Sequence, residues 1–238
     1  MPRRLVAALV GVGSFAGLSM ADIDRESTTV PTPQTREFDW RSSNEWRQRH
    51  DGNAAAARAN HAAVVFYGDS IMEAYASAPA FRALKQGGAL SLGTGGDMTQ
   101  HLLWRLDNGE IGSLQPEVVV VLIGINNFGH QDDSPEDVSK GVVAVARKLR
   151  AKLPEAKLVV LGILPSGQFP DDPLRARIKE ANRLTAAEAA EVGFRFEDIG
   201  AAFLQEDGSI SSDIMPDYLH PSPRGYEVFT DAVKPFLP

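Results

Sequence analysis

Five short apolar stretches, separated by longer segments with helical periodicity, constrain the fold of this chain most strongly. The stretches are rich in β-branched residues and run from 62 to 68, 89 to 93, 117 to 124, 157 to 164 and 194 to 199. The first, third and fourth are apolar almost throughout, which is typical of parallel strands covered on both faces. The helical patterns run over about 71 to 86, 97 to 108, 134 to 152, 173 to 192 and 223 to 236.

This alternation of strands and helices predicts the fold class. Such an order gives parallel strands joined by helical crossovers, so we expect an α/β fold with a doubly wound sheet. Asp97 is expected to begin the second helix as its N-cap, and Ser134 with Pro135 the third, because these residue types suit the free amides of a first turn. With 238 residues the chain can bury a sizeable core as one large or two small domains.

The N-terminal segment has a different composition from the rest. Two arginines precede an uncharged apolar run from 5 to 20, which ends in small residues, and this order predicts a secretory signal peptide over 1 to 21. The run is short for a membrane span, although an uncleaved anchor and an ordinary buried segment remain alternatives. Residues 22 to 37 are polar and contain prolines, and we interpret them as a linker into one domain over 38 to 238. We therefore expect a secreted or periplasmic protein with no stable membrane insertion after signal cleavage.

The charge composition and the absence of cysteine exclude several functions. The formal net charge is −7 and the basic residues are scattered, whereas nucleic-acid binding needs a concentrated basic face, so we expect no nucleic-acid partner. The sequence has no cysteine, which excludes disulfides, thiolate metal sites and a cysteine nucleophile. None of the histidines has a recognisable zinc-binding spacing, so no metal site is expected.

Small polar residues and glycines follow three successive predicted strands. GDS (68 to 70) follows the first, GTGGD (93 to 97) the second and GINN (124 to 127) the third. A single segment of this kind is usually a plain turn. The carboxyl ends of parallel strands, however, meet at the edge of the sheet where α/β proteins place their sites, so we expect the three loops to lie together.

Acyl transfer requires a serine hydroxyl, a neutral imidazole within reach of it and a third group that orients the imidazole. Ser70 is the candidate nucleophile. His220 is the best candidate base, because Asp217 precedes it by three residues and can come to the same side of the ring. A surface aspartate and histidine in a proline-rich loop is the alternative interpretation. Since the base must be neutral, we expect activity to fall in acid.

The same loops contain candidate donors for the negative oxygen of a tetrahedral intermediate. The Ser70 amide, a glycine amide of GTGGD and the side chain of Asn126 could supply three hydrogen bonds. Other motifs do not fit: GTGGDM is not a dinucleotide-binding motif, no phosphate-binding loop is present, and GDSIM lacks the second glycine of the α/β-hydrolase nucleophile elbow.

The four blocks GDS, GTGGD, GINN and DYLH (217 to 220) resemble those of the SGNH, or GDSL, hydrolases. The likeness covers about 44 to 236. It is closer still to the catalytic subunits of intracellular platelet-activating-factor acetylhydrolase and their bacterial relatives, through GGDMTQHLLWRLDNGEI, VVVVLIGINN and LVVLGILPSG. The resemblance implies a flavodoxin-like, three-layer α/β/α sandwich with a five-stranded parallel sheet and no cofactor.

Residue by residue, the resemblance implies Ser70 as the nucleophile, His220 as the base and Asp217 as the orienting partner of the base. It implies an oxyanion hole made by the amides of Ser70 and Gly96 and by the side chain of Asn126. Asp69 would be a structural neighbour of the site.

Two departures from the family pattern affect what can be carried over. Ser91 stands where close relatives usually have asparagine, so a hydrogen bond that supports the second loop is expected to change. Pro-Ser-Pro after His220 resembles bacterial members more than the animal subunits, so the animal substrate is not carried over.

Four aromatic residues are candidates to line the pocket: Tyr75, Trp104, Phe128 and Phe169. Aromatic residues at such positions are, however, more often part of the core.

The subgroup's preference for short acyl groups implies a serine esterase for acetyl esters, with carbohydrate or other small O-acetyl substrates favoured. A phospholipid acetylhydrolase of the platelet-activating-factor type or a lysophospholipase is the alternative within the enzyme class. An acyltransferase and an inactive carbohydrate-binding module are alternatives of other classes, and a homodimer is left open.

Overall fold

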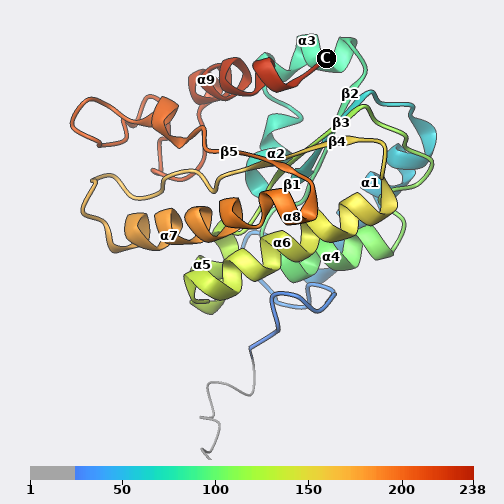
Figure 1. The fold of residues 1–238 in the computed structure, drawn as a ribbon, viewed down its shortest axis with the longest axis horizontal. Helices are drawn as coiled ribbons and strands as arrows, with labels where there is room; N and C mark the ends of the chain where they lie inside the picture. The colour runs from blue at the N-terminus through green and yellow to red at the C-terminus, as the bar shows by residue number, and fades with distance from the viewer. Residues whose placement is uncertain (1–24) are drawn as a thin grey trace, which may run out of the picture.

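The computed structural model describes residues 25 to 238, so the predicted signal peptide lies outside the described residues. In this part of the chain five parallel strands form one sheet with the order β2-β1-β3-β4-β5 (Figure 1). The strands are β1 (Val64–Gly68), β2 (Ala89–Gly93), β3 (Val118–Leu122), β4 (Lys157–Leu161) and β5 (Arg195–Glu197). Each predicted strand contains one of them, and the expected α/β fold with a five-stranded parallel sheet is confirmed.

Helices lie on both faces of the sheet and complete the three layers (Figure 1). Helices α2, α3 and α9 cover one face, and α4, α6 and α7 cover the other. The helices are α1 (Ser43–Ala59), α2 (Ser70–Tyr75), α3 (Arg82–Gln86), α4 (Thr99–Asp107), α5 (Ile125–Gln131), α6 (Pro135–Lys152), α7 (Pro173–Ala187), α8 (Ala189–Val192) and α9 (Pro223–Val233), with short 3-10 turns η2 (Pro79–Phe81), η3 (Gly200–Phe203) and η4 (Lys234–Phe236).

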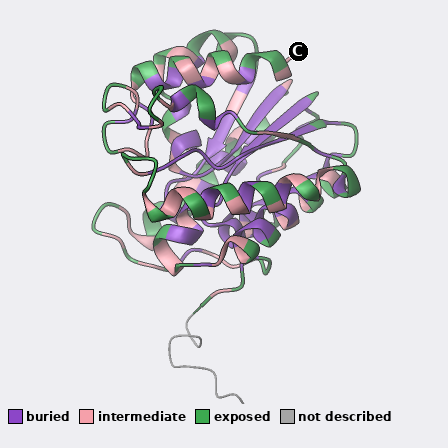
Figure 2. Cartoon of the chain, turned by 60° about the vertical axis from the view of Figure 1, so that its left-hand side comes forward, coloured by how far each residue is buried: buried purple, intermediate pink, exposed green. Residues whose placement is uncertain are grey.

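The strands contribute to two separate hydrophobic cores. Successive strand side chains point to opposite faces, so Val65 and Tyr67 join the core under α4 and α6, whereas Val64 and Phe66 join the core under α2 and α9. Figure 2 shows the sheet as the buried centre of the molecule, between helices whose outer faces are exposed. Burial on both faces explains why the strands are apolar throughout rather than in alternation.

The predicted helix starts have different outcomes. Ser134 is the N-cap of α6, where its hydroxyl accepts a hydrogen bond from the Asp137 amide at 3.2 Å, and Pro135 is the first helical residue, as expected. Asp97 is not a cap, because α4 begins at Thr99 and Met98 is in the N-cap position. The Asp97 carboxylate is instead fully buried and bonded to other side chains. The predicted helix over 71 to 86 is divided into α2, η2 and α3.

Residues 25 to 41, called the N-terminal arm below, pack along α4, α5 and α6. Its first part belongs to the predicted linker. Thr28 accepts a hydrogen bond from the Thr99 hydroxyl and donates one to the Asp137 carbonyl, each at 2.8 Å. Arg36 donates to the His130 carbonyl at 2.6 Å. Within residues 25 to 238, no helix is both long and apolar enough to cross a membrane.

Candidate active site

Ser70 stands at the carboxyl end of β1, on the first turn of α2. β1 ends at Gly68, where a Cβ atom would lie 2.2 Å from the Leu122 carbonyl oxygen, so only glycine permits this approach of two strands. Asp69 then caps α2, because its Oδ1 accepts a hydrogen bond from the Ile71 amide at 3.0 Å. The strand and the capped helix together hold Ser70 at the edge of the sheet.

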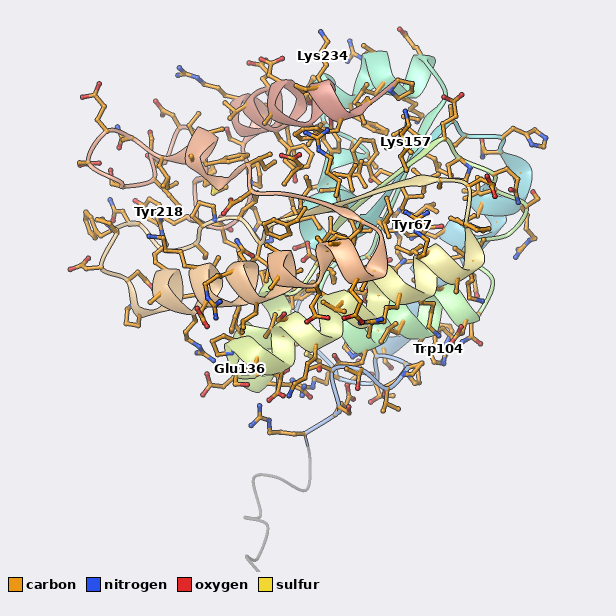
Figure 3. The ribbon with its side chains drawn as sticks, in the orientation of Figure 1. Tyr67, Trp104, Glu136, Lys157, Tyr218 and Lys234 are labelled. Atoms are coloured by element: carbon orange, nitrogen blue, oxygen red, sulfur yellow. The ribbon has the colours of Figure 1, made fainter. Side chains whose placement is uncertain are left out.

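Asp217 and His220 form one compact unit in the loop before α9. Tyr218 adopts a left-handed backbone conformation, with φ +58°, and Asp217 Oδ1 accepts hydrogen bonds from the amides of Leu219 and His220 at 3.1 and 2.7 Å. Asp217 Oδ2 lies 2.7 Å from His220 Nδ1, and His220 Nε2 lies 2.8 Å from the Ser70 hydroxyl. Tyr218 lies at the left of the molecule in Figure 3, far from Lys157, which begins β4.

These hydrogen bonds determine the charge of Asp217 and the orientation of the His220 ring. Partial burial alone would raise the pKa of Asp217, but the bonds from the side chain and amide of His220 hold it below its usual value. The ionised carboxylate can accept a hydrogen bond from a protonated Nδ1. The unprotonated Nε2 is then free to accept a hydrogen bond from the Ser70 hydroxyl. The three predicted side chains are thus in the order and at the distances that proton transfer from a serine requires.

The predicted oxyanion donors come from the loops after β2 and β3. Gly96 has φ +79°, a conformation that favours glycine. Within the described residues, neither the Gly96 amide nor the Ser70 amide donates to a protein acceptor. Asn126 was predicted in a loop but stands in the first turn of α5, and its Nδ2 donates to the Asp97 carbonyl at 2.9 Å. This bond connects the Asn126 side chain to the loop that carries Gly96.

A buried ion network lies beneath these loops, and no sequence pattern predicted it. The Asp97 carboxylate accepts hydrogen bonds from Trp46 Nε1 and Arg105 Nε, each at 2.6 Å. Arg105 also bonds Glu110 and donates to the carbonyls of Leu92 and Gly68 at 3.0 Å each. The guanidinium of Arg105 is fully buried. It therefore joins the ends of β1 and β2, which carry Ser70 and Gly96.

Burial and pairing act differently on the carboxylates around Arg105. Burial raises the pKa of Asp97, even though Arg105 opposes this effect. Burial also favours the neutral form of Glu110, but there Arg105 prevails and lowers the pKa. A charged arginine that bonds two buried carboxylates and two strand-end carbonyls links the loops that follow β1 and β2.

The N-terminal arm contacts the loop that carries Gly96. Arg41 forms two hydrogen bonds to Glu73, at 2.8 and 2.9 Å, and Glu73 accepts the Gly95 amide at 2.5 Å. The Trp40 ring lies against both glycines: a Cβ atom on Gly96 would be 2.9 Å from its Cη2, and one on Gly95 would be 3.5 Å from its Cζ3. The sequence placed the start of the domain nearby but offered no signal for this contact.

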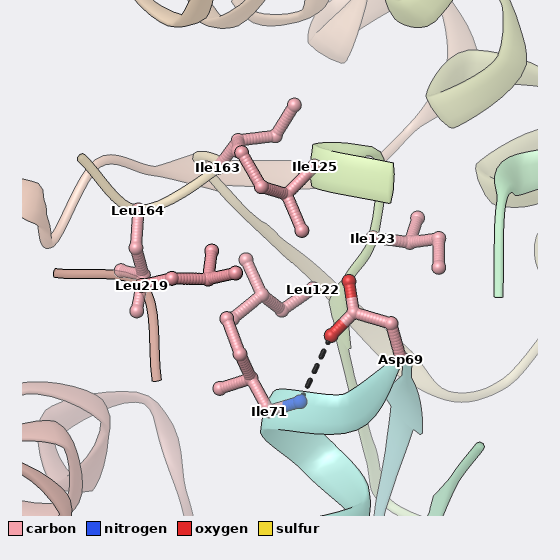
Figure 4. Close-up of a pocket in the computed structure, with 8 residues that line it drawn as sticks. All are labelled: Asp69, Ile71, Leu122, Ile123, Ile125, Ile163, Leu164 and Leu219. Atoms are coloured by element: carbon pink, nitrogen blue, oxygen red, sulfur yellow. Dashed lines mark hydrogen bonds between the residues drawn. The ribbon is translucent and has the colours of Figure 1, made fainter. Parts of the chain in front are cut away.

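An apolar crevice lies between the start of α2, the segments that follow β3 and β4, and the loop that carries Leu219 (Figure 4). It is too narrow to hold a water molecule. Its walls are Asp69, Ile71, Leu122, Ile123, Ile125, Ile163, Leu164 and Leu219. Asp69 and Ile71 flank Ser70 in the chain, and Leu219 precedes His220, so the crevice lies beside the backbone that carries these two residues.

Asp69 is the one titratable group in the wall of this crevice. Its side chain is fully buried, and Oδ2 has no hydrogen-bond partner among the described residues. Burial, reinforced by the nearby Asp97 carboxylate, raises the pKa of Asp69 to about 7. The group is therefore partly protonated near neutral pH, and its main role is to cap α2.

The other predicted residues lie in or near structural elements. Tyr75 is fully buried between α2 and α9, Trp104 packs on aromatic rings of α1, and Phe128 is buried under an arginine of α7. Phe169 is 56% exposed. None of the four lines the crevice.

Ser91 donates a 2.7 Å hydrogen bond to a backbone carbonyl of α2, and so connects β2 with that helix. No cluster able to hold a metal ion occurs in residues 25 to 238.

The parallel α/β/α sandwich and the family match place the chain among the carboxylic ester hydrolases. Residues 66–228 match the GDSL-like Lipase/Acylhydrolase family. The chain belongs to this family, as the sequence motifs predicted.

Individual relatives agree with this assignment. The chain is 38% identical over 205 residues to platelet-activating factor acetylhydrolase IB subunit alpha1 of Bos taurus, and the match covers 85% of each protein. A GDSL-like lipase from Bacteroides thetaiotaomicron has a similar fold, with a TM-score of 0.63 at 20% identity over 80% of this chain and 96% of that one. An acetyl xylan esterase has the same TM-score, 0.63, at 19% identity over 74% of this chain and 99% of that one.

Proposed function

We propose that the protein is a serine esterase that removes acetyl groups from small O-acetyl substrates, with Ser70, His220 and Asp217 as its catalytic residues. The observation that carries the proposal is the continuous hydrogen-bonded series from Asp217 through His220 to Ser70, at 2.7 and 2.8 Å. A hydroxyl in this position can lose its proton to the imidazole as it attacks a carbonyl carbon.

The reaction has two similar halves. In the first, Ser70 Oγ attacks the ester carbonyl and His220 Nε2 takes the proton, which it then gives to the departing alcohol. In the second, a water molecule loses a proton to His220 and attacks the acetyl-serine, and the acid leaves as Ser70 regains its proton. Asp217 holds the ring in the required orientation throughout and stabilises the imidazolium that forms in each half.

The negative oxygen of each intermediate would rest on the amides of Ser70 and Gly96 and on the side chain of Asn126. Two features support this role: the amides have no protein acceptor among the described residues, and the bond from Asn126 to the Asp97 carbonyl keeps the side chain beside Gly96. Donors that are fixed before the reaction stabilise developing charge without a reorganisation cost.

The crevice beside Ser70 favours a short acyl group. Its walls are aliphatic on all sides except for Asp69, and they leave too little width for a water molecule. A methyl group is wider than a water molecule, so even an acetyl group would enter only if a wall residue such as Leu219 or Ile163 moved, and a longer chain would need a larger displacement. This agrees with the acetyl esters that appear in the names of the Bos taurus relative and the acetyl xylan esterase.

Two substrate classes fit this proposal. Carbohydrate O-acetyl esters are favoured, and the acetyl xylan esterase has a similar fold. A phospholipid of the platelet-activating-factor type is the second candidate, because the 38% identical relative is named for that activity. We also propose export through the predicted leader over 1 to 21, which N-terminal sequencing of the mature protein would test.

The test is the Ser70→Ala variant, assayed with nitrophenyl esters from acetyl to palmitoyl, acetylated xylan and platelet-activating factor. We expect kcat for acetyl esters to fall by about 10⁴-fold or more, because loss of the nucleophile removes the covalent route. The thermal midpoint should stay close to that of the wild type. Ser77→Ala is the matched control, since Ser77 is exposed and lies just after α2. Undiminished hydrolysis by Ser70→Ala would exclude the mechanism.

Product analysis with and without a sugar acceptor separates hydrolysis from acyl transfer. Free acetate in both reactions is expected for an esterase. Acetylated acceptor as the main product would make the protein an acyltransferase, and binding of acetylated sugar without any turnover would indicate a carbohydrate-binding module.

A further inference from the structure

An exposed aromatic surface lies beside Gly96. Trp40 is 57% exposed, although it packs by its edge on the backbone of Gly95 and Gly96. Its ring stacks on Phe38, with centroids 5.0 Å apart and an interplanar angle of 18°. Its position next to the predicted oxyanion hole makes this indole a candidate binding surface for a ligand.

The sheet order places this surface on the opposite side of Ser70 from the apolar crevice. The crevice walls come from the segments after β3 and β4, such as Ile125 and Ile163, whereas Gly96 and Trp40 lie at the β2 side. An ester carbonyl bound over Ser70 has its acyl group on one side and its alcohol on the other. If the acetyl group enters the crevice, the alcohol extends over Gly96 towards Trp40.

The ring is held rigidly. The backbone of Phe38 and Arg41 is joined by two hydrogen bonds, of 3.0 and 3.2 Å, so Trp40 stands in a closed turn. The Arg41 side chain is fixed by its two bonds to Glu73, and Phe38 in turn packs on His130 of α5 at 4.9 Å. A surface that is ordered before binding loses little conformational entropy when a ligand arrives.

The charge around Trp40 favours a neutral ligand. The Arg41 guanidinium carbon lies 5.6 Å from the Trp40 ring centroid, so the positive charge of Arg41 already interacts with the negative face of the ring. A quaternary ammonium group on the same ring would meet a like charge at close range. The flat C–H face of a sugar ring carries no charge and can pack on an exposed indole.

We infer that Trp40, backed by Phe38, binds the alcohol half of the substrate, and that this alcohol is a neutral sugar ring. The inference rests on the proposed esterase function and names its substrate class. Trp40 makes no contact with the reacting atoms, so it acts on specificity and not on the chemical step.

The experiment compares Trp40→Ala and Trp40→Phe with the wild type on xylose tetraacetate and on ethyl acetate. We expect Trp40→Ala to raise KM for the sugar ester about tenfold, as the loss of one aromatic stacking contact implies, and to leave kcat/KM for ethyl acetate within about twofold. Trp40→Phe should restore most of the sugar affinity. Val30→Ala is the matched control, since Val30 is another exposed apolar residue of the arm.

Several results would overturn the inference. Equal losses on both esters would mean that Trp40 only supports the Gly96 loop, and an unchanged KM for the sugar ester would mean that the ring binds nothing. A larger loss on platelet-activating factor than on the sugar ester would assign the surface to a lipid headgroup. Binding of xylose tetraacetate to Ser70→Ala, with and without Trp40→Ala, tests the surface separately from catalysis. A wild type with no activity on any ester but with Trp40-dependent binding would refute the esterase alone.

Discussion

Replacement of Arg105 by methionine tests whether the buried ion network holds the two catalytic loops. Arg105 is fully buried and bonds two carboxylates, Asp97 and Glu110, and two strand-end carbonyls. Methionine fills much of the space but supplies no donor. The variant would leave two buried carboxylates side by side without a counter-charge.

The structure gives the size of the expected effect. Removal of one partner from a buried ion pair destabilises a protein by about 3 to 5 kcal/mol, and the total stability of a domain is only about 5 to 15 kcal/mol. For a chain of this length each kcal/mol lowers the thermal midpoint by roughly 2 to 4 °C. The Arg105→Met variant should therefore melt roughly 6 to 20 °C below the wild type.

Thermal melts followed by circular dichroism at pH 5 and pH 8 provide the assay. In the variant, burial without Arg105 raises the folded-state pKa of both carboxyls above their unfolded values, so stability is lost as pH rises. The deficit should therefore be larger at pH 8 than at pH 5. Arg147→Met is the matched control, because its ion pairs with Glu188 and Glu191 are exposed, and its midpoint should move by less than about 2 °C. An equal deficit at both pH values would refute the electrostatic reasoning.

The remaining predictions concern two residues at the site. Asn126→Ala should lower kcat for nitrophenyl acetate by about 10² to 10³-fold with little change in KM, and a loss below tenfold would remove Asn126 from the oxyanion hole. Asp69 has a folded-state pKa of about 7 against 3.8 when free, so its contribution to stability is full in acid and is lost as pH rises. From pH 5 to pH 8 the urea midpoint of the wild type should fall relative to that of Asp69→Asn, because the amide does not ionise. A fall in the midpoint of Asp69→Asn relative to the wild type would contradict a buried carboxyl that titrates in this range.

The strands and the three strand-end loops could be predicted because local sequence specifies them. Parallel strands buried on both faces must be apolar throughout, and a turn that approaches a neighbouring backbone as closely as Gly68 must be glycine. Asp217 and His220 are three residues apart and meet through local backbone geometry. Their contact with Ser70 required the family motifs, since no local pattern connects positions so distant in the chain.

The rest of the site depends on tertiary contacts that no spacing rule reveals. Asp97 has the sequence features of an N-cap, but its carboxylate binds the Arg105 guanidinium and the Trp46 indole instead of the first-turn amides. α4 therefore begins at Thr99 and not at the predicted position 97. Arg105 looks like any basic residue of an amphipathic helix. Trp40 lies next to a segment with linker composition, and only the packed arm brings it to Gly96.

The separation of the catalytic side chains along the chain has a consequence for folding. Asp217 and His220 can find each other within a single turn, whereas Ser70 and His220 are 150 positions apart. Contacts between distant positions form late, because loop closure over so many residues must be offset by other structure first. We therefore expect the loop before α9 to reach Ser70 only after the sheet and both helical layers are in place. Recovery of ester hydrolysis during refolding therefore marks completion of the last long-range contact, whereas recovery of helical signal marks much earlier events.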